Sequence, residues 1–443
     1  MNIPKEFLKR MQDELGENFQ EYQESLKRPY FRGLRVNSLK CSDEKLLSAL
    51  PFFLSKTPFA EHSYYLPQEA PKLGSHPFHH AGAFYLQEPS ACSAVTTLSP
   101  QKGDKVLDLC AAPGGKSTQI AAALGGEGLL WSNELVRSRA LVLLSNIERI
   151  GVRNAVVSSC RPDALCPGLA GFFDKVLVDA PCSGEGMFRK EEQACADWSL
   201  EHVSACAQRQ LAILNSAAEA VREGGVLVYS TCTFSKEENE EVIAAFLERQ
   251  PFCLEPIQDN FGRPAFGMPE ARRVFPMDGG EGHFVARLRR VGANEKYPAP
   301  YRASEDPACK LGTGLLAELV KEVSTSVVAR YGEQLLILPP GLPELRGLGV
   351  IRAGVPLGEI KKGRIEPAHG FFMAARPQEL TRLLDYPIDS QEVPAFLRGE
   401  ELAAPESWKG YAGVAVDGVL TGFGKCSGGR LKNRYPKGLR NHF

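Results

Sequence analysis

The stretch VLDLCAAPGGKS, residues 106–117, constrains the fold of this chain more than any other. An apolar strand pattern breaks there into small residues, a proline and two glycines, and the helix-forming segment STQIAAAL follows from Ser117. A strand, a glycine-rich turn and a helix form the first unit of a nucleotide-binding α/β fold. The glycines let the backbone approach a ligand, and the helix N-terminus offers it unpaired N–H groups.

From about residue 96, strands and helices alternate along the chain. Lys105–Cys110 is the first predicted strand, and four more apolar segments are predicted strands, at residues 128–134, 155–160, 172–181 and 226–232. Segments with apolar residues at helical spacing lie between them, and this alternation is typical of a doubly wound, mostly parallel sheet. The segments ARRVFP and HFVARLRR, at 271–276 and 283–290, are expected to add an antiparallel pair at the sheet edge.

A helix is predicted directly after the fifth strand, in the segment SKEENEEVIAAFLERQ at residues 235–250. Ser235 is expected to cap its N-terminus, because serine oxygens accept hydrogen bonds from the first free N–H groups of a helix. Glu238 stands three residues later, at the capping-box position.

The length of 443 residues allows about two to four domains, at roughly 150 residues each. We expect an N-terminal lobe at 1–95, an α/β core at 96–292, a linker at 293–310 and a C-terminal region at 311–443. Short apolar runs broken by glycine and proline predict that the last region is β-rich. Its end, residues 421–443, holds six Lys or Arg and no Asp or Glu in a chain whose formal net charge is −1. This asymmetry indicates a localised anionic partner, with a solvated surface tail as the alternative.

The cysteines and histidines show no metal-binding pattern. None of the twelve cysteines is spaced as CxxC, and the four histidines at 62, 76, 79 and 80 are irregularly spaced, so we expect loop histidines and no metal. The N-terminus lacks the apolar core of a signal peptide, and no apolar run reaches the roughly 18 residues of a membrane helix. We therefore expect a cytoplasmic protein without a membrane partner.

Three nucleotide-binding folds begin with a turn of this kind, and spacing distinguishes them. A Walker A loop needs glycine where this chain has Cys110, and the GxGxxG of dinucleotide dehydrogenases is missing. The looser turn of an S-adenosylmethionine-dependent methyltransferase remains. Glu134 ends the second strand about 20 residues past the turn, where an acidic side chain accepts hydrogen bonds from ribose hydroxyls. Asp163, after the third strand, is a candidate for the adenine, with a turn residue as the alternative.

Two further motifs place cysteines at the ligand edge of the sheet. DAPCSGEG, residues 179–186, ends the fourth strand, and STCT, residues 230–233, ends the fifth. The carboxyl ends of neighbouring parallel strands line one crevice, so we expect a cluster there. Its members are Cys110, Asp179, Cys182 and Cys232. The alternative is that the two later cysteines are only small residues at strand ends.

Two thiols and a carboxylate beside a methyl donor suit methylation of carbon 5 of cytosine. That carbon is a poor nucleophile until a thiolate adds to carbon 6 and converts the ring to an enamine. A carboxylic acid at the N3 side stabilises the adduct by hydrogen bonding or proton transfer. A base must later remove the carbon-5 proton so that the thiol can leave, and the target base must first be swung out of any stack.

The motifs DLCAAPGGKS, DAPCSGEG and STCT, in this order, resemble those of the Sun/Fmu family of RNA cytosine-5 methyltransferases. The resemblance covers residues 80–290 and includes FYLQEPSA at 84–91. The C-terminal region, ending GRLKNRYPKGLR, resembles the bacterial ribosomal RNA methyltransferases of the RsmF type, which carry a PUA-like RNA-binding domain. The resemblance implies a Rossmann-like class I methyltransferase core between an N-terminal lobe and a β-rich RNA-binding module.

The resemblance also implies roles that the residues alone leave open, since DNA cytosine methyltransferases use the cysteine of the Pro-Cys motif as nucleophile. It implies that Cys232 is the nucleophile and that Cys182 assists release of the methylated product. It implies that Asp179 contacts the target base and that Lys116 helps hold the active-site loop. The implied cofactor contacts are Cys110, Ala111, Ala112, Pro113, Gly114, Gly115, Lys116, Glu134, Asp163 and Asp179, with Arg161 competing with Asp163 by spacing.

Three basic segments are candidate RNA contacts: Lys190 in the turn MFRK, the aromatic and basic segment Pro29–Lys40, and the C-terminal residues beside Tyr435. We expect an enzyme that methylates carbon 5 of cytidine in structured RNA, with small-subunit (16S) ribosomal RNA as the substrate and no obligate protein partner. Methylation of transfer RNA or of DNA, and RNA binding without catalysis in ribosome assembly, are the alternatives.

Overall fold

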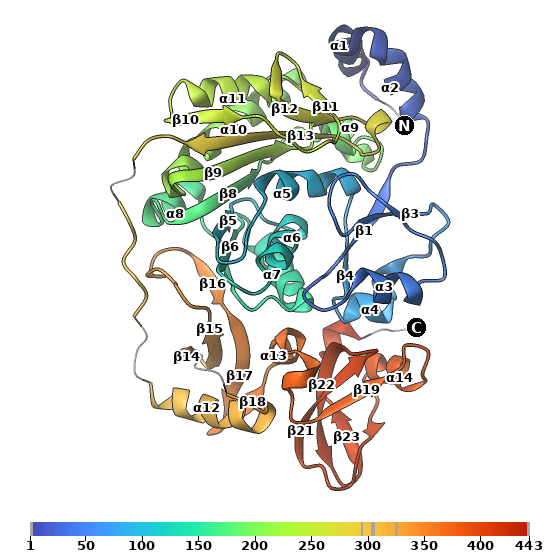
Figure 1. The fold of residues 1–443 in the computed structure, drawn as a ribbon, viewed down its shortest axis with the longest axis vertical. Helices are drawn as coiled ribbons and strands as arrows, with labels where there is room; N and C mark the ends of the chain where they lie inside the picture. The colour runs from blue at the N-terminus through green and yellow to red at the C-terminus, as the bar shows by residue number, and fades with distance from the viewer. Residues whose placement is uncertain (1–2, 294–295, 303–305, 324–326, 441–443) are drawn as a thin grey trace.

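Five parallel strands form the centre of the protein, in the computed structural model that describes residues 3–293, 296–302, 306–323 and 327–440 (Figure 1). They are β5 (Lys105–Asp108), β6 (Leu129–Asn133), β7 (Ala155–Ser158), β8 (Phe173–Asp179) and β9 (Val221–Thr231), in the spatial order β7-β6-β5-β8-β9. The order reverses at β5, so a crevice opens at the carboxyl ends of β5 and its neighbours. The predicted doubly wound sheet is confirmed.

Helices cover both faces of this sheet. One face carries α5 (Ser93–Leu98), α6 (Gly115–Leu124) and α7 (Arg137–Ile150), and the other carries α8 (Pro162–Gly168), α10 (Leu200–Ala220) and α11 (Glu240–Leu247). Each set buries its own apolar cluster against the strands. Because helices cover both faces, β6 and β7 are buried along their whole length.

Antiparallel strands extend the sheet at both edges. At one edge β13 (His283–Arg290) pairs with β9, followed by β12 (Met268–Val274) and β11 (Arg263–Ala265), with β10 (Phe252–Glu255) also on β13. The predicted antiparallel pair is therefore confirmed as β12 and β13. At the other edge β16 (Val350–Ala353) pairs with β7, although it comes from the C-terminal region. That region thus completes the core sheet, which no sequence pattern predicted.

The N-terminal lobe combines a small sheet with short helices. Its elements are α1 (Lys5–Leu15), α2 (Phe19–Leu26), α3 (Asp43–Ala49), α4 (Pro77–His80) and the sheet β2 (Ser55–Lys56), β3 (Ser63–Leu66), β1 (Arg32–Val36), β4 (Phe84–Leu86). Strand β1 lies inside that sheet. Its Arg35 is buried and donates to the carbonyl of Gly115 at 3.0 Å and to Thr118 Oγ1 at 2.7 Å. The expected RNA-facing role of this segment is wrong for Arg35, which supports the glycine-rich turn instead.

The predicted β-rich C-terminal region is confirmed as two sheets. The first holds β14 (Val327–Tyr331), β15 (Gln334–Leu338), β17 (Val355–Lys361) and β18 (Arg364–Pro367), beside α12 (Pro307–Leu319). The second holds β19 (Leu383–Tyr386), β21 (Gly410–Val416), β22 (Val419–Ser427), β23 (Arg430–Asn433) and β20 (Leu402–Ala403), with α13 (His369–Ala374) and α14 (Glu392–Arg398) nearby. Helix α12 begins inside the expected linker 293–310, of which residues 294–295 and 303–305 lie outside the described residues.

Tyr435 joins the last sheet to the N-terminal lobe. Its ring is buried, and its hydroxyl lies 2.9 Å from Nδ1 of His80. The two parts of the chain share one apolar cluster around it. The expectation that this tyrosine forms part of a nucleic-acid contact surface is therefore wrong, because its ring fills an interface within the protein.

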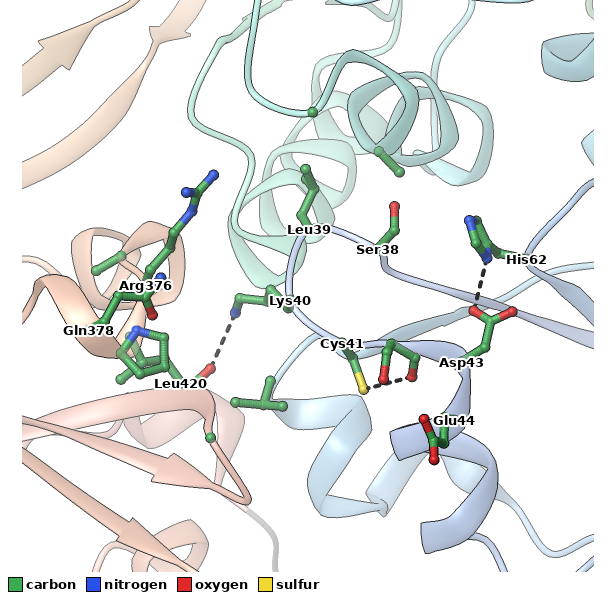
Figure 2. A pocket seen from close by; sticks show the side chains of 17 residues that line it. Ser38, Leu39, Lys40, Cys41, Asp43, Glu44, His62, Arg376, Gln378 and Leu420 are labelled. Atoms are coloured by element: carbon green, nitrogen blue, oxygen red, sulfur yellow. Dashed lines mark hydrogen bonds and ion pairs between the residues drawn. The ribbon is translucent and has the colours of Figure 1, made fainter.

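Lys40 connects three parts of the chain, and Figure 2 shows its contact with Leu420. Its Nζ donates to the carbonyls of Ala81 at 2.8 Å, Arg149 at 3.4 Å and Leu420 at 3.2 Å, which belong to the lobe, to α7 and to the last sheet. Burial lowers the pKa of Lys40 to about 7. An open hollow of about 970 Å³ lies beside it and reaches α6 at Gly125. That end of α6 is opposite to the glycine-rich turn, so the hollow lies away from the carboxyl edge of the sheet.

Candidate active site

Lys116 and Asp179 form an ion pair at the carboxyl edge of the sheet. Asp179 is the last residue of β8, and Lys116 lies in the first turn of α6. Lys116 Nζ is 2.7 Å from Asp179 Oδ2, and Ser230 Oγ donates to Asp179 Oδ1 at 2.7 Å. Burial opposes charge on both groups, but their mutual attraction outweighs it, so the pKa of Asp179 is lowered and the pKa of Lys116 is raised. Both groups are therefore charged at neutral pH.

Cys182 and Cys232 lie side by side in the loops that follow β8 and β9, which we call the Cys182 loop (residues 180–191) and the Cys232 loop (residues 232–239). Their Sγ atoms are 3.3 Å apart, and the N–H of Gly186 donates to the carbonyl of Cys232 at 2.9 Å. The contact with Cys232, together with burial, raises the pKa of the Cys182 thiol well above its usual value. Cys182 therefore keeps its proton and can donate it to Cys232 Sγ. Cys182 lies three residues after Asp179, and Cys232 lies two residues after Ser230, which donates to Asp179, so the ion pair and the thiol pair belong to one site.

Side chains of α7 hold the glycine-rich turn in place. The guanidinium of Arg139 donates to the carbonyl of Ala112 at 3.1 Å, and the amide of Asn146 donates to the carbonyl of Pro113 at 2.9 Å. Gly114 has a φ of +116°, a backbone conformation that side chains rarely adopt, at the point where the chain enters α6. The turn is thus fixed from behind, where a Cβ at Gly114 would also meet Leu143 Cδ1 of α7 at 3.2 Å.

Two buried carboxylates flank the turn. Glu134 follows β6, is 4% exposed and accepts a hydrogen bond from the N–H of Val136 at 2.9 Å. Asp108 ends β5, and its Oδ2 accepts from Ser117 Oγ at 2.7 Å. The other oxygen of Asp108 is buried and has no partner among the described residues, and burial raises the pKa of this carboxyl to about 7. Asp108 was missed from the sequence, although an acid inside an apolar strand is the signal that could have found it.

His283 is a second residue that sequence reasoning missed. It lies on β13, with Nδ1 donating to the carbonyl of Gly282 at 2.8 Å and Nε2 4.0 Å from Asp179 Oδ1. Burial lowers its pKa to about 4, so the ring is neutral and presents the lone pair of Nε2 toward the ion pair. The described residues contain no group of three or more His, Cys, Asp or Glu that could hold a metal ion.

The structure does not bring Asp163 or Lys190 into this buried cluster. Asp163 lies in the first turn of α8 and pairs with Arg161, whose Nε is 3.0 Å from Asp163 Oδ1, and both side chains are exposed. The adenine contact of either residue stays a prediction. Lys190 Nζ lies 5.8 Å from the ring centre of the exposed Tyr30, so a basic and an aromatic side chain stand together at the end of the Cys182 loop.

The predicted capping by Ser235 and Glu238 is wrong. Helix α11 begins at Glu240, and both side chains turn inward instead. Ser235 Oγ donates to Glu185 at 2.7 Å, and Glu238 accepts from the N–H of Ser183 at 2.9 Å. These bonds to the Cys182 loop replace the bonds that would have started the helix earlier.

Four family models match consecutive parts of the chain. They are described as the N-terminal domain of 16S rRNA methyltransferase RsmF at residues 3–89, 16S rRNA methyltransferase RsmB/F at 95–289, the RsmF rRNA methyltransferase first C-terminal domain at 316–374, and the methyltransferase RsmF PUA domain at 384–441. The chain is also 34% identical over 467 residues to the ribosomal RNA small subunit methyltransferase F of Klebsiella pneumoniae, covering 99% of this chain and 96% of the relative. The chain belongs to the RsmF family of methyltransferases.

Other relatives agree with this family. The protein of the same name from Vibrio campbellii is 32% identical, covering 99% of this chain and 97% of the relative. A methyltransferase homolog protein from Pyrococcus horikoshii has a TM-score of 0.58 at 30% identity, covering 65% of this chain and 95% of that one. NSun6 from the same organism, solved with SFG, has a TM-score of 0.59 at 26% identity, covering 65% and 98%. The similarity to these solved structures thus spans about two thirds of the chain, and that to the RsmF relatives spans all of it.

Proposed function

We propose that this chain transfers a methyl group from S-adenosylmethionine to carbon 5 of a cytidine in small-subunit ribosomal RNA. The thiol pair carries this proposal, because the Sγ atoms of Cys182 and Cys232 lie 3.3 Å apart in the same site as the Lys116–Asp179 ion pair. Methylation of an amine or a hydroxyl needs no thiol, whereas a pyrimidine carbon must first be activated by one. The full-length relatives are named as small-subunit ribosomal RNA methyltransferases, in agreement with this chemistry.

The residues around the glycine-rich turn fit S-adenosylmethionine. We assign its binding to residues 110–116 with Glu134 and Asp179, and Asp163 remains a predicted contact. Glu134 is placed for ribose hydroxyls, and Asp108 has a buried carboxylate oxygen with no donor among the described residues. One structural neighbour was solved with SFG, an analogue of this cofactor. The cofactor supplies an electrophilic methyl group to the site.

Cys232 is the nucleophile in this proposal. The Cys182 thiol can donate to its sulfur, and Cys232 attacks as the thiolate, the nucleophilic form of cysteine. That thiolate adds to carbon 6, and the electron density moved to carbon 5 takes the methyl group. Loss of the carbon-5 proton to a base restores the ring as the carbon–sulfur bond breaks. The departing thiolate is stabilised by the Cys182 thiol, which gives Cys182 its role in release.

Asp179 acts as a carboxylate in this mechanism. Lys116 holds it in the charged form, so it accepts a hydrogen bond, for which the exocyclic amine of cytosine is the matching donor. The ammonium of Lys116 is the proton-bearing member of the pair and can stabilise negative charge that develops on the ring. The sequence predicts a protonated carboxylic acid that stabilises the adduct. In this proposal the Lys116 ammonium takes that role, so Asp179 can remain ionised.

RNA binding is assigned to the parts of the chain on either side of the core. The lobe at 1–95 presents Tyr30 beside Lys190, and the region at 311–443 ends in exposed basic residues, with the core at 96–292 and a connecting segment at 293–310. We favour ribosomal RNA over transfer RNA as the substrate because the full-length relatives are named ribosomal RNA methyltransferases. The enzyme would meet this substrate in the cytoplasm. Among the described residues, no helix has the length and apolar character needed to cross a bilayer.

The test is transfer of a labelled methyl group to deproteinised 16S RNA, to assembled small subunits and to transfer RNA. We expect incorporation at carbon 5 of cytidine in small-subunit RNA, and none with Cys232→Ser. Transfer at the unchanged rate by that variant would refute the nucleophile. Incorporation into transfer RNA alone would refute the substrate while leaving the chemistry intact.

A further inference from the structure

The residues that follow the two cysteines contact each other directly. Ser183 follows Cys182, Thr233 follows Cys232, and their hydroxyl oxygens are 2.8 Å apart. Both side chains are buried, although they belong to different loops. A polar contact inside the protein at this position indicates that the two loops are held as one unit.

Glu185, from the Cys182 loop, bonds to the Cys232 loop. Its carboxylate accepts from Thr233 Oγ1 at 2.8 Å, from the N–H of Phe234 at 2.8 Å and from Ser235 Oγ at 2.7 Å. Trp198 Nε1 donates to the same carboxylate at 2.9 Å. Glu185 is 3% exposed, so water cannot replace these bonds easily.

Glu238, from the Cys232 loop, accepts hydrogen bonds from the Cys182 loop. It accepts from the N–H of Ser183 at 2.9 Å and from Ser183 Oγ at 2.5 Å, and Gln210 Nε2 donates to it at 2.8 Å. Its exposed fraction is 0%. Each cysteine loop thus contributes one buried carboxylate that binds the residue directly after the other cysteine.

We propose that Glu185 and Glu238 form a reciprocal clasp, a pair of positioning residues that keeps Cys182 Sγ in contact with Cys232 Sγ during release of the methylated RNA. Carbons 5 and 6 of cytosine are adjacent, and in the covalent intermediate the sulfur of Cys232 is bonded to carbon 6. The Cys182 thiol can stabilise that sulfur as it leaves only if its loop stays in register with the Cys232 loop. This role rests on the proposed function, whereas the clasp itself is a property of the free protein.

Disulfide formation in the free protein measures the clasp without RNA or cofactor. Diamide takes two electrons and two protons from a pair of thiols, which leaves a disulfide and the corresponding hydrazine. Two thiols already in contact react in this way faster than thiols that must first move together. Peptide mapping gives the rate of the Cys182–Cys232 bond separately from the other cysteines.

We expect Glu185→Gln and Glu238→Gln to slow this disulfide at least about tenfold, because each amide turns N–H groups toward donors that need an acceptor. Asp174→Asn is the matched control. Asp174 lies at the other end of β8 and accepts from the N–H of Lys105 at 2.7 Å and from Arg222, so it is a carboxylate tie of similar kind far from the thiols. Ser183→Ala, which keeps the N–H bond to Glu238, should slow the reaction by a smaller factor.

The second readout is the amount of RNA that stays bound to protein after denaturation when cofactor is present. Loss of the clasp should raise this methylated, covalent fraction severalfold, as release slows while attack continues. Disulfide rates equal to the unmodified protein in both glutamate variants, or rates lowered as much by Asp174→Asn, would overturn the clasp. If the glutamate variants do not fold, Ser183→Ala and Thr233→Val decide by the same rates. An absence of any methyl transfer would refute the proposed function, and the disulfide rates would still test the clasp.

Discussion

The Lys116 ammonium lies 2.7 Å from the Asp179 carboxylate at the point where β8 ends and α6 begins. Each group is buried, so each depends on the other to remain charged. The pair links the turn assigned to the cofactor with the strand end assigned to the base. A change in either residue should therefore lower the rate of methyl transfer by more than the accompanying loss of folding stability would account for.

Asp179→Asn should lower kcat/KM for methyl transfer by about 10²- to 10³-fold, because it replaces the charged acceptor for the base with a neutral amide and leaves the Lys116 ammonium buried without a counter-charge. The double variant with Lys116→Met should lose less than the product of the two single losses, since it removes the charge that either single change leaves unpaired. Methyl incorporation by the four proteins measures this coupling. Losses that multiply in full would contradict it.

Lys40→Met should lower the free energy of unfolding by about 2–4 kcal/mol, because three carbonyls from three parts of the chain lose their donor. Cofactor affinity should not change, because Lys40 and its hollow lie at the end of α6 opposite to the glycine-rich turn. RNA affinity should fall, because the last sheet is held less firmly to the rest of the protein. Urea unfolding and titration calorimetry measure these effects. Lys45→Met removes one exposed bond, to the carbonyl of Asp417, and is the control. Equal losses in the two variants would argue against a special role for Lys40.

The combined change Lys432→Ala and Arg434→Ala should weaken RNA binding without changing which RNA is preferred. Lys432 is exposed on β23, and Arg434 is exposed directly after that strand. If each neutralises one phosphate, the slope of log affinity against log salt should become shallower by roughly 1–2. Lys361→Ala on β17, which pairs with Glu359, is the control. An unchanged slope in the double variant would show that this end of the chain is not the RNA surface.

His369→Gln should become more stable relative to the unmodified protein as the pH falls from 6.5 to 4. Burial lowers the pKa of His369 to about 4, so in this window the unfolded chain binds a proton that the folded protein does not. The free energy of unfolding therefore falls by up to about 1.4 kcal/mol for each pH unit, and this fall is absent in the glutamine variant. Asp108, with its pKa raised to about 7, acts with the opposite sign in both proteins and cancels in the difference. A difference that is constant with pH would contradict a neutral buried His369.

The sheet and the residues at its carboxyl edge could be predicted because a buried parallel strand leaves a strong local signal. The segments that became β5, β6, β7, β8 and β9 are apolar runs that end in small or polar residues, and parallel strands bring those ends together. Cys182, Cys232 and Asp179 were found in this way. Their distances and charges depend on contacts between separate loops, which no local pattern contains.

The errors share a physical cause, which is burial of polar residues by distant parts of the chain. Glu238 has the spacing of a helix cap, but Ser183 and Gln210 offer it donors inside the protein. Arg35 and Tyr435 are of residue types that often contact RNA. In the folded protein, however, Arg35 binds the glycine-rich turn and Tyr435 binds His80. Strand β16 lies about 190 residues after its partner β7, and no local pattern shows that the two strands pair.

The central claim is that Cys232 attacks the base and Cys182 is needed to release it. Cys182→Ala, incubated with 16S RNA and S-adenosylmethionine, should give a protein–RNA adduct that survives denaturation and contains methylated cytosine. The double variant with Cys232→Ser should give none. An adduct that persists without Cys232, or complete absence of an adduct in Cys182→Ala while methyl transfer continues, would contradict this division of roles.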